Sequence, residues 1–144
     1  MKVRNISMAI GAAVFLLATG CHTFKPAAPK PMTFQCNLPR AEFMKKAKEL
    51  LERNRYTVDV YDEEKGEIEA DRVPTYNGIG ENLIVRGPYV FNVVYNNGTV
   101  TVVVQTVHDR DGKPYAVESH DEGSDIGERR NFMPVVEGLK ASCK

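Results

Sequence analysis

The residues of this 144-residue sequence that are best suited to chemistry lie in one polar stretch of its last third. Histidine is the usual proton carrier and metal ligand near neutral pH. His108 and His120 both fall within this stretch, whereas His22 lies far upstream. Carboxylates that could complete a metal site with the two histidines lie beside them, and they are Asp109, Asp111, Asp121 and Glu122. This grouping gives one hypothesis for function, a small-ligand or metal-binding module.

The spacing within the stretch argues against a specific metal or catalytic site. It contains no helical HExxH or comparable pattern of ligands. A calcium loop built on Asp109, Asp111 and Glu118 would begin at Val107, which has no side-chain oxygen to offer. Exposed turn residues are the simpler interpretation, and no serine lies in a G-x-S-x-G setting. The sequence therefore predicts no metal ligand, no cofactor and no catalytic residue, which favours a protein that is not an enzyme.

The N-terminal segment leads directly to Cys21, the first of three cysteines. Lys2 and Arg4 precede an uncharged, mostly apolar stretch, which is the charge pattern of a secretory signal. That stretch is shorter than the ~20 apolar residues of a membrane-spanning helix. The letters LATG at 17–20 then place small and apolar residues immediately before Cys21. This ending resembles the lipobox of bacterial lipoproteins; a plain secretory signal followed by a chance cysteine is the alternative.

The resemblance to the lipobox implies both a covalent modification and a location in the cell. Residues 1–20 would be removed as a signal peptide, the sulfur of Cys21 would carry a diacylglyceryl group, and the new amino terminus would be acylated, for instance with palmitate. Two or more acyl chains hold a protein firmly in a bilayer. Ala18 stands where the family most often has leucine. His22 replaces the aspartate that commonly retains such proteins in the inner membrane, so the resemblance implies a lipid anchor at the periplasmic face of the outer membrane.

The segment that follows Cys21 predicts a leash and then one domain. Residues 21–33 include three prolines and little that could pack, which is typical of an extended spacer. At ~3.1 Å per residue such a spacer reaches roughly 35 to 40 Å at most. Residues 34–144 have the usual size of one domain. They carry 15 basic and 19 acidic side chains, a formal charge of −4, and so lack the basic stripe that nucleic acid requires.

Cys36 and Cys143 remain once Cys21 is assigned to lipid. They stand near the two ends of the domain, in a compartment where disulfides form and persist. A redox pair or a metal site lacks support, because the sequence has no C-x-x-C motif and no histidine near either cysteine. The sequence therefore predicts a structural disulfide between Cys36 and Cys143, with free or intermolecular thiols as the alternative.

Apolar residues of the domain recur with the periods of helices and strands. Phe43, Ala47 and Leu51 fall on one face of a helix. Asn97 and Gly98 separate two apolar segments and tolerate the positive φ of a tight hairpin turn. The order predicts an α+β fold (β-α-β-β-β-β-α), with an antiparallel sheet of four to five strands and two helices on one face. The expected elements are a strand at 33–37, a helix at 39–54, strands at 56–61, 67–71, 89–95 and 99–107, a short strand at 113–119, and a last helix that ends at Cys143. In this last helix Pro134 indicates either a kink or a start near residue 131.

This order of elements behind a lipobox and a proline-rich leash resembles the helix-grip domains of the C component of the outer-membrane β-barrel assembly machinery. The resemblance covers residues 34–143 in topology only, and this chain has one such domain where that component has two. It implies an interaction or scaffolding protein and transfers no site residues. The expected function is therefore a membrane-anchored envelope lipoprotein whose domain binds another envelope protein, with the small-ligand or metal-binding module as the alternative.

Overall fold

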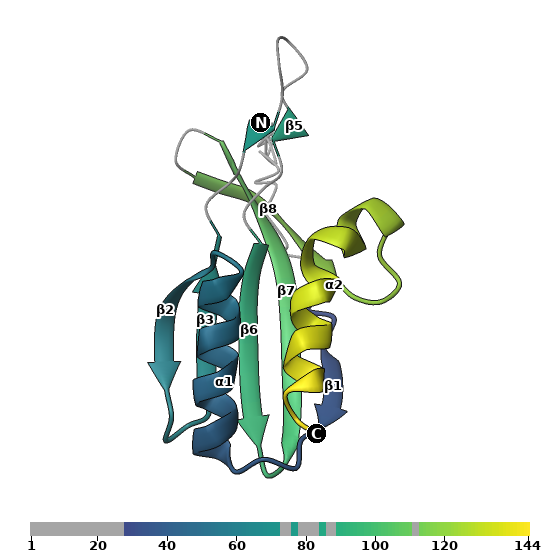
Figure 1. Ribbon diagram of the computed structural model, residues 1–144. Coiled ribbons are helices and arrows are strands. Elements are labelled where there is room, and N and C mark those ends of the chain that lie inside the picture. The colour runs from purple at the N-terminus through teal and green to yellow at the C-terminus, as the bar shows by residue number, and fades with distance from the viewer. Residues whose placement is uncertain (1–27, 73–75, 78–83, 86–88, 111–112) are drawn as a thin grey trace, which may run out of the picture.

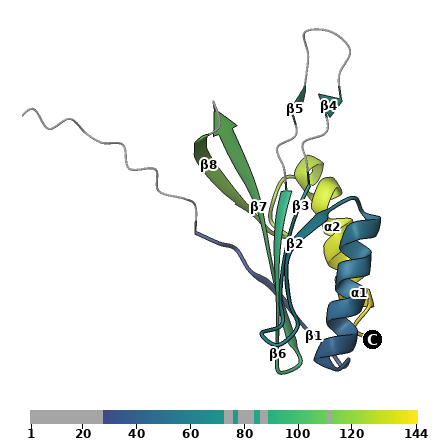
Figure 2. The same cartoon turned by 90° about the vertical axis from the view of Figure 1, so that its left-hand side faces the viewer.

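The computed structural model describes residues 28–72, 76–77, 84–85, 89–110 and 113–144, and it confirms an α+β fold (Figure 1). The elements in chain order are β1 (Met32–Gln35), α1 (Arg40–Arg53), β2 (Thr57–Asp62), β3 (Glu67–Asp71), β4 (Tyr76–Asn77), β5 (Ile84–Val85), β6 (Tyr89–Asn96), β7 (Thr99–Arg110), β8 (Lys113–His120) and α2 (Ile126–Ala141). Six strands form one antiparallel sheet in the order β1-β7-β6-β3-β2, with β8 also pairing with β7, and β4 pairs with β5 in a separate ladder. Figure 2 confirms that both helices cover the same face of the main sheet.

The longest strand of this sheet is β7, and three other strands pair with it. Its partner on one side is β6, joined to it by a turn in which Asn97 and Gly98 both have positive φ, as the sequence predicts. On the other side, β1 pairs with Thr99–Val102 and β8 pairs with Val104–Arg110. Two segments far apart in the sequence thus share one edge of β7. The sheet has six strands rather than the predicted four to five, because the strands expected at 33–37 and 113–119 both join it.

Helix α1 lies close to its predicted bounds. Pro39 precedes the first turn, where its missing N–H costs nothing. Phe43, Met44, Ala47 and Leu51 are buried against the sheet, so the apolar face that the sequence predicts is the one that packs. Charged residues cover the outer side, including the exposed ion pair between Lys46 and Glu42 at 3.0 Å.

Helix α2 begins at Ile126, about five residues before the predicted start near 131. Asp125 caps it, because its side-chain Oδ1 accepts a hydrogen bond of 2.8 Å from the backbone N–H of Gly127. Pro134 lies inside the helix, where it cannot donate to the carbonyl of Arg130. Of the two predictions for Pro134, a helix start near 131 was therefore wrong, because the aspartate cap sets the boundary; the structure has the proline inside the helix, where the alternative of a kink also placed it.

The core lies between the helices and the covered face of the sheet. Its largest fully buried side chains include Phe43 from α1, Phe91 from β6 and Phe132 from α2. The ring of Tyr56 meets that of Phe91 edge to face, with centroids 4.9 Å apart. The inward side of β7 contributes Val100, all of whose side chain is buried, together with its alternate neighbours Val102 and Val104. Each of the two helices therefore closes part of one continuous core.

The turn between β2 and β3 is pinned against the sheet by Gly66. This residue has a φ of +76°, and its carbonyl accepts a hydrogen bond of 2.8 Å from the N–H of Tyr95. A Cβ added at Gly66 would collide with the carbonyl oxygen of Tyr95. We expect Gly66→Ala to lower the free energy of unfolding by about 2 kcal/mol, through both the left-handed backbone and the collision. Urea unfolding followed by circular dichroism measures this loss.

Gly98→Ala is the matched control, since Gly98 also has a positive φ (+80°). A Cβ there would approach only the carbonyl oxygen of Cys36, at 3.4 Å. The excess loss in Gly66→Ala over Gly98→Ala therefore measures the collision alone. Equal losses in the two variants would show that the turn moves away from Tyr95 without cost.

Candidate functional site

The predicted lipid anchor lies outside the described residues, as do His22 and the predicted signal peptide. Along the described part of the chain, no helix is long and apolar enough to cross a bilayer. The described chain begins at residue 28 and enters the sheet at Met32, the first residue of β1. Lipidation of Cys21 stays a prediction.

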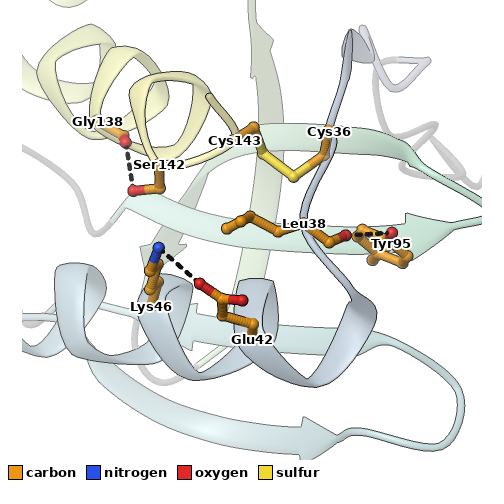
Figure 3. The surroundings of a disulfide bond; sticks show 8 residues. All are labelled: Cys36, Leu38, Glu42, Lys46, Tyr95, Gly138, Ser142 and Cys143. Atoms are coloured by element: carbon orange, nitrogen blue, oxygen red, sulfur yellow. Dashed lines mark hydrogen bonds and ion pairs between the residues drawn. A yellow bond between two sulfur atoms is a disulfide. The ribbon is translucent and has the colours of Figure 1, made fainter.

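Cys36 and Cys143 form a disulfide in the structure, and the bond joins residues 107 positions apart (Figure 3). Cys36 directly follows β1, and Cys143 lies just beyond α2. Both side chains are buried, with exposed fractions of 5% and 2%. The pairing that the sequence predicts thus connects the first strand to the end of the last helix.

Hydrogen bonds around the disulfide hold the two chain ends in place. The N–H of Cys36 donates to the carbonyl of Gly98 at 2.7 Å, and the N–H of Asn37 donates to the carbonyl of Cys143 at 3.2 Å. The hydroxyl of Tyr95 donates to the carbonyl of Leu38 at 2.7 Å, a bond that Figure 3 also shows. The segment that leads from β1 into α1 is therefore fastened to β6, to the β6–β7 turn and to the C-terminus.

His120 is the one candidate from the polar stretch whose side chain the structure describes as buried, with 3% of it exposed. Its Nε2 lies 2.6 Å from the hydroxyl oxygen of Thr106, and its Nδ1 lies 3.5 Å from a carboxylate oxygen of Glu128. In the tautomer that donates from Nδ1 to the carboxylate, Nε2 accepts from the hydroxyl. The imidazole also packs against the rings of Tyr89 and Phe132, with centroids 5.5 and 5.7 Å away.

A hydroxyl, an imidazole and a carboxylate in this order resemble a nucleophile, its base and an orienting group. Only 6% of Thr106 is exposed, however, and its side chain faces the same interior as Val104 and Phe132. A nucleophile must reach its substrate, and this hydroxyl is enclosed by the core. The geometry instead supports a structural link, in which His120 joins β7 and β8 to the first turns of α2.

The predicted metal-binding group is not assembled by the residues whose side chains are described. His120 points to Glu128, while a side-chain oxygen of Asp121 accepts from the N–H of Gly123 within the turn before α2. The side chains of His108, Asp109 and Asp111 lie outside the described residues. Within the described part, no three His, Cys, Asp or Glu side chains are close enough to hold an ion.

The carboxylates of β2 and β3 make one side of the uncovered sheet face acidic. Glu67, Glu69 and Asp71 alternate with the buried Ile68 and Ala70. Burial, and secondarily the negative charge of Asp59, raises the pKa of the Asp71 carboxyl. Because the folded chain then holds this proton more tightly than the unfolded chain, the stability that the group adds at acid pH is lost as the pH rises through its folded-state pKa. The exposed carboxylates of Glu67 and Glu69 nevertheless disfavour a negatively charged partner at this surface.

The outer side of α2 carries the most exposed large apolar residue among those described, Ile126, with 60% of its surface accessible. Ile126 lines a shallow groove of about 380 Å³ with Arg129, Arg130, Met133, Pro134 and Glu137. Sequence reasoning missed this surface, because a helix predicted to start near 131 does not contain its first half. The cap at Asp125 is the signal in the sequence that could have revealed it.

No protein-family model matches the chain, and a search of curated proteins finds no matching relative. The candidate surfaces therefore rest on the geometry of this chain alone.

Proposed function

We propose that this chain is a bacterial envelope lipoprotein whose domain binds another envelope protein. Residues 1–20 are removed, Cys21 is lipidated, and the domain is held on a short leash at the periplasmic face of the outer membrane. The protein is not an enzyme. The function lies in bringing a bound partner to the membrane, since the chain combines a lipobox-like ending with a compact domain.

The buried disulfide between Cys36 and Cys143 is the observation that best supports this proposal. Structural disulfides persist in oxidising compartments such as the periplasm and are rare in the cytosol. The position of β1 gives further support, because the sheet begins at Met32 and leaves only a short stretch of chain after Cys21. An extended leash of that length keeps the domain within roughly 35 Å of the anchor.

We expect Cys21→Ser to abolish incorporation of radiolabelled palmitate and to move the protein out of the membrane fraction. The thiol of Cys21 would be the only attachment point for the diacylglyceryl group, and signal cleavage would depend on that group. Labelling of growing cells, followed by membrane sedimentation and mass determination of the N-terminus, measures both effects.

Cys36→Ser and Cys143→Ser together form the matched control, because they also remove cysteines but leave Cys21 in place. This pair should keep the label. Full labelling of Cys21→Ser, or a wild-type chain without acyl groups, would refute the lipid anchor. The binding part of the proposal is tested separately, by cross-linking in intact cells and mild solubilisation, where recovery of the protein alone under several conditions would count against a partner.

A further inference from the structure

The groove on the outer side of α2 combines apolar side chains with a basic end. Ile126, Met133 and Pro134 supply the apolar part, and Arg129 and Arg130 lie within the first two turns beside them. Ile126 is the exposed large apolar side chain of this surface, whereas Met133 is partly buried against the core, so the apolar contact that the groove offers is small. The groove is large enough for one or two side chains of a partner, which suits a short peptide segment better than a broad rigid interface.

The two guanidinium groups of the groove differ, because Arg129 is partly engaged within the domain and Arg130 is exposed. Arg129 donates to the backbone carbonyl of Glu122 at 3.1 Å through one terminal nitrogen, while its Nε is buried without a hydrogen-bond partner. Arg130 is exposed. Among the residues that the structure describes, neither arginine forms an ion pair with a carboxylate. Arginine binds carboxylates in a bidentate geometry, so this end of the groove selects an acidic group.

The charge of the rest of the domain limits the surfaces to which an acidic segment can bind. Residues 34–144 carry a formal charge of −4, and acidic residues alternate along β3, which lies with β2 at the edge of the sheet away from α2 (Figure 1). A negatively charged segment is repelled from that side and attracted to the arginines of α2. Glu137 also lines the groove, so the charge complementarity that points to an acidic partner lies at the end formed by Arg129 and Arg130.

In Figure 2 the described residues before β1 lie on the side of the sheet away from α1 and α2. The backbone N–H of Lys30 donates to the hydroxyl of Ser119 at 2.8 Å and fixes the leash against β8 on its way out of the domain. The net negative charge of the domain disfavours adhesion to anionic lipid headgroups, so we assign the groove to a protein partner.

We propose that the groove lined by Ile126, Arg129, Arg130, Met133 and Pro134 docks an acidic segment of another envelope protein. An apolar side chain of that segment packs against Ile126 and Met133, and carboxylates beside it bind Arg129 and Arg130. This inference rests on the proposed lipoprotein function, and it adds the site and the chemistry of the partner.

A random peptide library provides the probe, because it makes no assumption about the partner's sequence. The full mature chain is held in nanodiscs of neutral phospholipid, and peptides that bind empty nanodiscs are first removed. We expect the enriched peptides to carry an aliphatic or aromatic residue flanked by Asp or Glu. Affinity for these peptides should fall at least tenfold in Arg130→Glu and in Ile126→Asp, and it should weaken with added salt.

Arg53→Glu is the matched control, since Arg53 is an exposed basic residue at the end of the other helix. It makes the same change in charge and should leave the affinity unaltered, and thermal unfolding of all three variants checks that the fold is kept. The proposal would be overturned by a failure to enrich peptides, by enriched peptides without carboxylates, or by equal binding to Arg130→Glu.

A second measurement distinguishes binding to a peptide from binding to lipid. It also distinguishes a failure of the groove proposal from a failure of the lipoprotein proposal. If Arg130→Glu instead lowers adhesion to vesicles rich in phosphatidylglycerol, the groove is a membrane surface and the peptide proposal is wrong. The acyl groups on Cys21 are measured by mass on the same preparation. Their absence refutes the lipoprotein proposal, and selection on the full chain in solution then still decides whether the groove binds acidic peptides.

Discussion

Replacing Cys36 and Cys143 by alanine together is expected to lower the free energy of unfolding by about 4 to 5 kcal/mol. The disulfide spans 107 residues, and closing so long a loop removes much of the conformational entropy of the unfolded chain. Alanine avoids burying new hydroxyl groups at two sites that are almost fully enclosed. Urea unfolding of the oxidised wild type, the reduced wild type and the double variant measures the change.

The reduced wild type should unfold close to the double variant, because both lack the same covalent link. Coincidence of all three curves would show that the bond adds no stability. Hydrogen exchange locates the effect, since β1 has only four residues and pairs with β7 alone. Without the disulfide we expect the amides of β1 to exchange faster than those of β6, as short edge elements open locally.

Local patterns in the sequence were sufficient for most of the elements. The helix at 39–54 became α1 at Arg40–Arg53, and the turn at Asn97 and Gly98 formed between β6 and β7. Both depend on residues within one element or one hairpin, where side-chain period and turn chemistry act directly. The shared edge of β7 depends instead on where two distant segments meet, and no local period encodes that.

The candidate site was harder to predict for the same reason. Asp121 and Glu122 directly follow His120 in the sequence, but the structure places Glu128 beside the imidazole. The turn at 121–124 reverses the chain, so the first turn of α2 returns over the end of β8. A helix predicted to start near 131 hides both this contact and the exposed position of Ile126. Because this one boundary was wrong, the sequence predicted neither the contact between His120 and Glu128 nor the groove on the outer side of α2.

His120→Ala is expected to lower the free energy of unfolding by about 3 kcal/mol, the second largest effect. The change leaves a cavity between Tyr89 and Phe132, and it deprives the buried hydroxyl of Thr106 of its partner at 2.6 Å. Thr106→Val keeps the shape of the side chain and removes only that hydroxyl, so it should cost about 1 to 2 kcal/mol. Urea unfolding of both single variants and of the double variant completes a thermodynamic cycle.

The cycle separates the hydrogen bond from the packing around it. If Thr106 and His120 stabilise each other, His120→Ala should cost about 1 kcal/mol less in the Thr106→Val background than in the wild type. Glu128→Gln is the control for the outer contact, and it should cost less than about 1 kcal/mol because 44% of that side chain is exposed. Additive losses in the cycle would mean that the rings of Tyr89 and Phe132 hold the imidazole, and the link between β7, β8 and α2 would then be one of packing alone.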